Sequence, residues 1–341
     1  MTSPSYALPF GSPASPLLIL DLANNHNGSV EHGKAIIDSA AEALSDISFP
    51  AAIKFQYRNL NRTYKKKKEI GDEIISFEIK KNFISIIDIL SLTTYANTFN
   101  LKVGISFFSN EDVLDFKGDI KKFDFFKVPS VELKNLQLIK YLLKLRKHVY
   151  ISTGAHIEKE IEKTFLEIQS FKNWSPMHCI SNYPTALFNS RLGYIKYLKK
   201  KWKREVGFSS HESNFLSCIE AISKGVNCIE RHITLDNHSN GLDHSSSSVE
   251  EDFRKMVEYW ENLEHMNSGN LARTCNQGEL INRQNLGRTY YFKKNMKIGQ
   301  KISKNDIDYR CPAVGYGAQD QDFFLNRKII KKADARNVIT K

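Results

Sequence analysis

Short apolar runs alternate with longer segments of helical periodicity over the first 265 residues of the chain. We predict strands at 17–20, 51–55, 101–107, 123–128, 148–151, 176–180, 206–208 and 226–229. Strands that alternate with helices are typical of a parallel α/β protein, and eight rounds favour a closed barrel over an open sheet. The pattern therefore predicts an α/β fold, a (β/α)₈ TIM barrel over residues 1–265.

The segments between these strands predict the helices that surround the barrel. We expect helices at about 30–44, 74–99, 135–145, 158–169 and 249–263, with another between the last two strands. Ser29 is a suitable N-cap for the first, because its hydroxyl can accept a hydrogen bond from a first-turn amide.

The pattern changes after the barrel. Residues 266–282 are polar, with weak periodicity, and predict a linker. Short strand-like segments separated by turns follow at 289–292, 296–299 and 309–312. We therefore predict a second, small domain of short strands over residues 283–341.

Polar and charged side chains stand at or just after the ends of the predicted strands. They are Asp21, Lys54, Gln56, Lys127, Glu132, Asn182, His211 and His232. In a parallel barrel the carboxyl ends of all strands lie on one face, which is where active sites are built. The sequence therefore predicts an active site at that face.

His211 and His232 each follow one of the last two strands. Two imidazoles that converge there could share one divalent metal ion and leave coordination positions open for water or substrate. They could equally be two separate, hydrogen-bonded histidines, and spacing alone does not decide. Lys54 lies in the apolar run AAIKFQ, where a lysine needs a partner.

Composition narrows the function classes. The net charge is +11, but the basic runs at 65–68, 199–204 and 328–332 lack interleaved aromatic residues, so we expect solvated faces and no nucleic-acid partner. Part of the excess can serve small anionic substrates. No apolar run approaches the roughly 20 residues that span a bilayer, and the first residues lack the features of a signal peptide. The five cysteines are scattered without CxxC spacing, so we expect reduced thiols, a cytoplasmic protein and no cysteine-bound metal.

Eight stretches, in order, resemble the bacterial sialic acid synthases, which condense phosphoenolpyruvate with an N-acetylated hexose. They are 25–28 (NHNG), 53–56 (IKFQ), 127–132 (KVPSVE), 151–154 (ISTG), 181–185 (SNYPT), 207–211 (GFSSH), 229–236 (IERHITLD) and 241–244 (GLDH). Each motif alone is weak, but eight in register cover nearly the whole barrel. The tail is similar to the antifreeze-like (SAF) domain of that family, with Arg310 near the position of a family arginine.

The resemblance implies an N-acetylneuraminate synthase that joins phosphoenolpyruvate to N-acetylmannosamine with water and releases phosphate by C–O cleavage. Synthases of legionaminic, pseudaminic or related acids are the alternative, and the stretch 241–244 fits the sialic and legionaminic types better. The resemblance also implies a domain-swapped homodimer, in which Arg310 reaches the acceptor sugar bound by the partner barrel.

The same resemblance implies roles for the individual side chains. His211 and His232 would hold a divalent metal, most readily Mn²⁺, with Mg²⁺ or Co²⁺ as substitutes. The phosphoenolpyruvate pocket would use Lys54, Lys127, Ser106, Ser130, Ser152, Asn182 and Ser209. The acceptor hydroxyls would contact Asp21, Gln56, Tyr183 and Asp243. Glu132 would handle water or its proton, although a carboxylate there could instead stabilise a helix N-terminus. We expect local structural roles for His26 and His244.

Three departures leave the acceptor open. Asp21 stands where the family has Glu, which shortens the reach of the carboxylate. Ser210 replaces the Asp of the usual Ser-Asp-His, which removes a partner behind the metal site. One additional residue separates Arg310 from Pro312. Two other classes remain: a metal-dependent hydrolase, which would want a carboxylate-rich cluster, and a non-catalytic sugar- or ice-binding protein. The charged residues at the strand ends argue against the latter.

Overall fold

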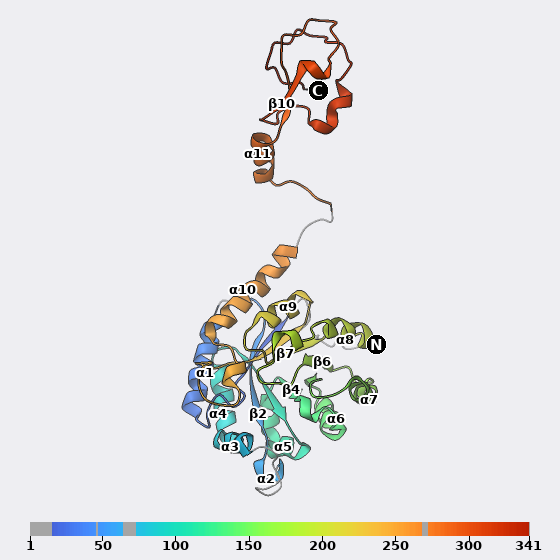
Figure 1. Cartoon of the computed structure of the whole chain (residues 1–341). Helices are drawn as coiled ribbons and strands as arrows, with labels where there is room; N and C mark the ends of the chain where they lie inside the picture. The colour runs from blue at the N-terminus through green and yellow to red at the C-terminus, as the bar shows by residue number, and fades with distance from the viewer. Residues whose placement is uncertain (1–15, 46, 64–72, 268–271, 341) are drawn as a thin grey trace, which may run out of the picture. The chain divides into compact units, whose positions relative to one another are not determined.

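The computed structural model describes residues 16–45, 47–63, 73–267 and 272–340 (Figure 1). The chain divides into two compact units, residues 1–267 and 268–341. Each unit is described by itself.

The first unit is a closed barrel of eight parallel strands in chain order, β1 to β8. The strands are β1 (Leu17–Asp21), β2 (Ala51–Tyr57), β3 (Lys102–Phe107), β4 (Phe125–Val128), β5 (His148–Ser152), β6 (Trp174–Cys179), β7 (Gly207–Ser210) and β8 (Cys228–His232). β8 pairs with β1, with His232 opposite Asp21, which closes the ring. The predicted TIM barrel is confirmed, with strand ends displaced by a few residues.

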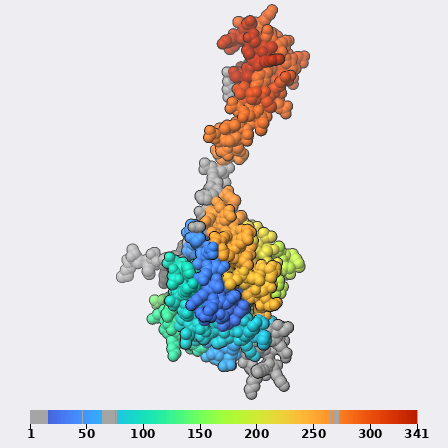
Figure 2. All heavy atoms as spheres, turned by 90° about the vertical axis from the view of Figure 1, so that its left-hand side faces the viewer, coloured from blue at the N-terminus to red at the C-terminus, as the bar shows by residue number. Residues whose placement is uncertain are grey.

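Helices surround this barrel. They are α1 (Val30–Ala43), α2 (Leu60–Thr63), α3 (Glu73–Lys81), α4 (Ile86–Asn97), α5 (Asn110–Asp115), α6 (Leu136–Lys144), α7 (Glu158–Ile168), α8 (Gly193–Trp202), α9 (Leu216–Ser223) and α10 (Glu250–Asn267). α1 packs between α4 and α10, and the three lie side by side on one face (Figure 2). Ser29 caps α1 as predicted, since its hydroxyl accepts a hydrogen bond from the amide of His32 at 3.2 Å.

The single helix predicted over 74–99 is wrong, because the segment is broken at residues 82–85 into α3 and α4. Ser85 caps α4: its hydroxyl accepts from the Asp88 amide at 3.2 Å, and the Asp88 carboxylate accepts from the Ser85 amide at 3.0 Å. This reciprocal pair satisfies amides that an uninterrupted helix would have bonded internally. α5 and α8 were not predicted.

Side chains of the strands alternate between two apolar layers. Leu17, Ile19, Phe125, Tyr150 and Met177 are among the residues that fill the barrel interior. A larger buried cluster includes the alternate strand residues and the inner faces of the helices. The interior is therefore packed, and the site must lie above it, at the carboxyl ends of the strands.

The second unit contains α11 (Gln277–Leu286) and an antiparallel pair, β9 (Thr289–Phe292) and β10 (Ile307–Arg310). Its own small core is Tyr290, Phe292, Met296, Ile302, Ile307, Phe324, Ile329 and Ile339. Two details differ from the sequence prediction. The expected strand at 296–299 is reduced to one bridge, Met296 to Ala333. The expected linker 266–282 contains the last residues of α10 and the first turns of α11.

Candidate active site

A cavity of about 610 Å³ opens at the carboxyl ends of the barrel strands. The predicted site residues that line it are Asp21, Gln56, Ser106, Lys127, Ser130, Asn182, Tyr183, His211, His232 and Asp243. These residues come from strands or loops spread over most of the ring, so the barrel brings together side chains that are up to 222 positions apart in the sequence.

The two predicted metal ligands meet in this cavity. The ring centroids of His211 and His232 are 5.1 Å apart, and the Tyr183 ring lies 4.3 Å from His211. Nδ1 of His211 lies 3.0 Å from the carbonyl oxygen of Ile180, so a proton on Nδ1 leaves Nε2 as the free acceptor. Nδ1 of His232 is buried and has no hydrogen-bond partner among the described residues. Each imidazole therefore retains a nitrogen that could bind a ligand.

The protonation of His232 also fits a metal ligand. Burial lowers the pKa of His232 to about 4, against the opposing attraction of Asp243 and Asp21. The ring is therefore neutral near pH 7, which is the form that binds a divalent cation. Within the described residues, no group of three or more His, Cys, Asp or Glu is arranged as a complete metal site. The pair fits an open site that substrate and water would complete.

A buried ion pair lies directly beside this histidine pair. Nζ of Lys54 is 2.8 Å from Oδ2 of Asp21 and 3.0 Å from the Ser106 hydroxyl. Gln56 donates to the same Asp21 oxygen at 2.9 Å. Burial alone would raise the pKa of Asp21, but the nearby positive charge of Lys54 holds it well below its usual value. Asp21 is the partner that we expected for a lysine in an apolar stretch, but Lys54 does not line the cavity.

Lys127 and Arg58 are the positively charged side chains among the described residues that line the cavity. Lys127 lies near the end of β4. It forms an ion pair with Glu230 and lies 3.4 Å from the Ser209 hydroxyl. Ser209 donates to the same Glu230 oxygen at 3.1 Å and lies outside the cavity lining. Glu230 was not predicted, although it stands two residues before His232 on the same face of β8.

A glycine that follows β5, the strand next to that of Lys127, makes room for hydroxyl groups. A Cβ on Gly154 would lie 2.3 Å from the Ser181 hydroxyl and 2.7 Å from that of Ser130. Both serines line the cavity. Ser152 is buried and is not part of the lining, and its hydroxyl has no hydrogen-bond partner in the part of the chain that the structure describes. The space at Gly154 therefore forms a small cradle of donors suited to anionic oxygens.

Glu132 and Arg310 are placed differently from the rest. Glu132 does not line the cavity, and its carboxylate accepts a hydrogen bond from the Asn135 amide at 2.8 Å. Arg310 belongs to the second unit, where it forms an ion pair with Asp308 and its side chain is 73% exposed. Arg310, Lys293 and Arg336 line a hollow of about 440 Å³ in that unit.

Other residues that line the cavity were not predicted as site residues. Some come from loops without a recognisable pattern, and Ile75 and Ile79 come from α3. Asn24 donates to Asp243 from its backbone at 3.1 Å and from its side chain at 2.7 Å. The Arg58 guanidinium lies 3.7 Å from the centre of the Phe108 ring. An apolar set also lines the cavity: Ile75, Ile79, Phe108, Val131 and Leu242.

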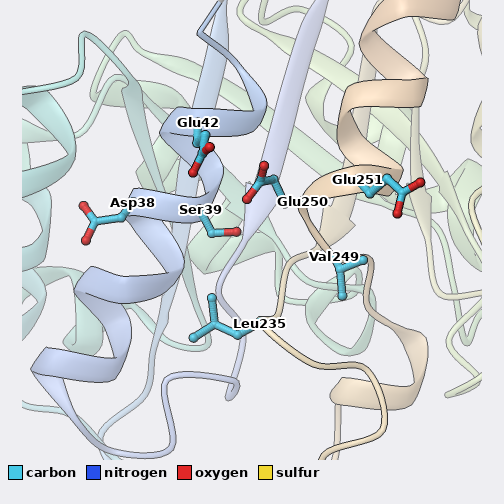
Figure 3. A pocket seen from close by; sticks show the side chains of 7 residues that line it. All are labelled: Asp38, Ser39, Glu42, Leu235, Val249, Glu250 and Glu251. Carbon is cyan, nitrogen blue, oxygen red and sulfur yellow. The ribbon is translucent and has the colours of Figure 1, made fainter.

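A second hollow, of about 530 Å³, lies on the outside of the barrel between α1 and the start of α10 (Figure 3). Asp38, Glu42, Glu250 and Glu251 line it. Arg254 pairs with Glu250 at 2.7 Å and with Glu42 at 3.5 Å, so these carboxylates are partly neutralised on the surface.

Imidazoles, a lysine, hydroxyls and carboxylates meet at the mouth of a closed (β/α)₈ barrel. This arrangement is typical of a barrel enzyme that acts on an anionic substrate. A model of the NeuB family matches residues 36–271 of the chain. The chain therefore belongs to the NeuB family, the phosphoenolpyruvate-condensing synthases of nonulosonic acids, whose members use a divalent metal.

Several known proteins are similar to this chain in sequence or in fold. The uncharacterized protein MJ1065 of Methanocaldococcus jannaschii is 30% identical over 320 residues, which are 92% of this chain and 90% of that protein. The N,N'-diacetyllegionaminic acid synthase of Campylobacter jejuni is 26% identical over 91% of this chain and 95% of that enzyme. A solved structure, the N-acetylneuraminic acid synthetase of Leptospira borgpetersenii, has a TM-score of 0.69 at 23% identity and covers 82% of this chain and 94% of its own. Within the described ranges, no helix is long and apolar enough to cross a bilayer.

Proposed function

We propose that this protein is an N-acetylneuraminate synthase, which condenses phosphoenolpyruvate with N-acetylmannosamine and water and releases phosphate. The observation that carries the proposal is the meeting of His211 and His232 in one cavity with the buried charges of Asp21 and Lys127. In the reaction, C3 of phosphoenolpyruvate forms a bond with the aldehyde carbon of the open-chain sugar. Water adds at C2, and the C–O bond to phosphate breaks.

Phosphoenolpyruvate carries a carboxylate and a phosphate, and the wall around Gly154 and Lys127 suits both. Ser130, Ser181 and Asn182 supply short donors, and Lys127 supplies the charge. Lys54, Ser152 and Ser209 act from beneath this layer: Lys54 holds Asp21 ionised and in place, and Ser209 holds Glu230 against Lys127. Ser106 lines the cavity and accepts a hydrogen bond from Lys54 at 3.0 Å. These donors fix the orientation of the substrate before it reacts.

His211 and His232 would hold the divalent cation, most readily Mn²⁺, with Mg²⁺ or Co²⁺ as substitutes. When bound, the cation supplies a Lewis acid that polarises the aldehyde oxygen of the acceptor. The protein orients its two ligands through neighbouring groups. His211 faces the carbonyl of Ile180, and the Tyr183 ring packs against both imidazoles, with centroids 4.3 Å from His211 and 6.2 Å from His232.

The acceptor would lie between Asp21, Gln56, Tyr183 and Asp243, which line the cavity near His232. One observation favours a second candidate acceptor. Ile75, Ile79, Phe108, Val131 and Leu242 give the cavity an apolar wall. Such a wall suits a deoxygenated, diacetamido hexose, as in the legionaminic or pseudaminic type of synthase, better than a sugar with a full set of hydroxyls.

Release of phosphate from phosphoenolpyruvate tests the proposal. N-acetylmannosamine and Mn²⁺ should give phosphate and N-acetylneuraminate, and a chelator should stop the release. H211A should lose this turnover and keep its fold, whereas H238A, which changes an exposed histidine, should behave as the wild type. A diacetamido hexose that reacts faster would establish the second candidate. No release with any N-acetylated hexose would refute the synthase.

We further propose that the second unit is an antifreeze-like domain that acts in a domain-swapped homodimer. Arg310 is exposed and lies beside Lys293 and Arg336, so it is available to contact an acceptor bound by another subunit. Glu132 would provide the carboxylate that handles water or its proton at C2. We also propose that the enzyme is cytoplasmic, because its proposed substrate is phosphoenolpyruvate.

A further inference from the structure

A buried arginine lies behind the two predicted metal ligands. Arg231 immediately precedes His232 on β8 and is paired in register with Ser210, which immediately precedes His211. Because side chains alternate along a strand, the two imidazoles point to the cavity, while Ser210 and Arg231 point to the outer layer of the barrel. Both outer residues are fully or almost fully buried, with 0% exposure for Arg231 and 1% for Ser210.

No carboxylate in the described part of the chain pairs directly with Arg231. The guanidinium instead donates through Nη1 to the Ser210 hydroxyl at 2.8 Å, and through Nη2 to the backbone oxygen of Glu212 at 3.0 Å. Ser210 in turn donates to the Glu212 carboxylate at 2.7 Å. The charge of the buried guanidinium is therefore balanced by Glu212 through one bridging hydroxyl.

Glu212 also bonds to the metal-site strand itself. The same oxygen that accepts from Ser210 accepts the backbone N–H of His211 at 3.1 Å. Glu212 is 2% exposed. The Glu212 carboxylate therefore connects the backbone of His211, through the Ser210 hydroxyl, to Arg231, the residue that precedes His232.

We propose that Glu212 is a positioning residue, which with Ser210 and Arg231 fixes the separation of His211 and His232 for metal binding. The family resemblance places an aspartate at position 210, where this chain has serine. In this chain the Glu212 carboxylate, two residues after position 210, reaches Arg231 through the Ser210 hydroxyl. The inference rests on the proposed metal site, and it concerns how that site is held.

The test is a titration of the full-length, metal-free protein with Mn²⁺, followed by the loss of the electron paramagnetic resonance signal of free Mn²⁺. E212Q keeps the size of the side chain and removes its charge. We expect its dissociation constant for Mn²⁺ to rise by about 10- to 100-fold, the usual effect of losing a group that orients a ligand. E220Q, which changes an exposed carboxylate paired with Lys224, is the matched control and should bind as the wild type.

The double variant S210D/E212Q returns a carboxylate to position 210, within reach of Arg231. The double variant should bind Mn²⁺ with a dissociation constant close to that of the wild type. If E212Q weakened binding only by destabilising the protein, a second substitution would not be expected to restore it. Even if E212Q does not fold, the double variant decides: tight binding supports the role and weak binding overturns it. Wild-type binding by E212Q would also overturn it. A wild-type protein that binds no Mn²⁺ would refute the metal site itself, and this role with it.

Discussion

Nζ of Lys54 lies 2.8 Å from Oδ2 of Asp21, and the two side chains are 0% and 1% exposed. Each member of a buried ion pair depends on the other, because the loss of one partner leaves an uncompensated charge in the protein interior. This pair sits beside His232, whose Nε2 is 3.5 Å from the same Asp21 oxygen. Asp21 therefore contributes both to the stability of the fold, through Lys54, and to the arrangement of the candidate active site, through His232.

We expect K54M to lower the free energy of unfolding by about 3–5 kcal/mol, because the Asp21 carboxylate would remain buried and unpaired. Urea denaturation measures the change. K140M is the control: Lys140 pairs with Glu167 at the same 2.8 Å, but on the surface, so its loss should cost below about 1 kcal/mol. Equal effects of the two substitutions would show that burial of the Lys54 pair has no energetic consequence.

G154A should impair binding of phosphoenolpyruvate. The new methyl group would lie 2.3 Å from the Ser181 hydroxyl, 2.7 Å from that of Ser130 and 3.2 Å from the Cys179 carbonyl, so both hydroxyls must turn away. We expect the KM for phosphoenolpyruvate to rise by about tenfold or more, the loss of one or two hydrogen bonds to a charged group. Initial rates of phosphate release measure it.

Gly193 provides the comparison for G154A, since a Cβ there would meet no described atom within 4 Å. G193A should keep the wild-type KM. A G154A enzyme with an unchanged KM would contradict the placement of phosphoenolpyruvate against this wall.

E132Q separates the two roles open to Glu132. As a group that handles water or its proton, the carboxylate should contribute about 100-fold or more to kcat. As a helix-terminal carboxylate, it should contribute only to stability, by less than about 1 kcal/mol. N135A removes the hydrogen bond of 2.8 Å to Glu132 without removing the carboxylate, and should leave kcat near the wild-type value. An E132Q variant with full kcat would exclude the catalytic role.

The barrel could be predicted because one physical pattern, apolar runs alternating with helical periods, recurs eight times. The same regularity placed His211 and His232 on one face, since His211 directly follows β7 and His232 is the last residue of β8. The depth of each side chain could not be predicted in this way. Lys54, Ser152 and Ser209 stand at strand ends like the lining residues, yet they lie beneath the cavity surface. Depth depends on packing across the ring, which no local pattern encodes.

Residues carried by irregular loops were also beyond prediction. Asn24, Arg58 and Phe108 reach the cavity only because the barrel brings their loops together. Two signals were present and could have been used. Ser85 and Asp88 have the spacing of a capping box, which marks the break between α3 and α4. Glu230 and His232 are two residues apart on one strand, and so share a face.

His26 is expected to make the folded protein less stable at acid pH. It is 4% exposed, and burial lowers its pKa from 6.5 to about 4. Above pH 6.5 the ring is neutral in both states. Below that pH the unfolded chain takes up a proton that the folded protein refuses, so stability falls as the pH drops from 6.5 through 4.

H26N removes this proton uptake and keeps an acceptor near the Gly28 amide, which bonds Nδ1 of His26 at 3.1 Å. Between pH 7 and pH 4.5, the wild type should therefore lose about 2–3 kcal/mol more unfolding free energy than H26N. Urea denaturation at both pH values measures this difference, with H238N as an exposed control. Parallel losses in wild type and H26N would show that His26 does not titrate as described.

Arg310 tests the proposed exchange of domains between subunits. R310A should raise the KM for the acceptor sugar, and H211A should abolish turnover by its own barrel. If each site uses the barrel of one subunit and the arginine of the other, a mixed dimer contains one site with both groups intact. After the two inactive variants are unfolded and refolded together, about a quarter of the wild-type rate should return at low acceptor concentration, because half of the dimers are mixed and each has one intact site. A mixture no more active than the mean of its two parents would place Arg310 in its own subunit's site, or in none.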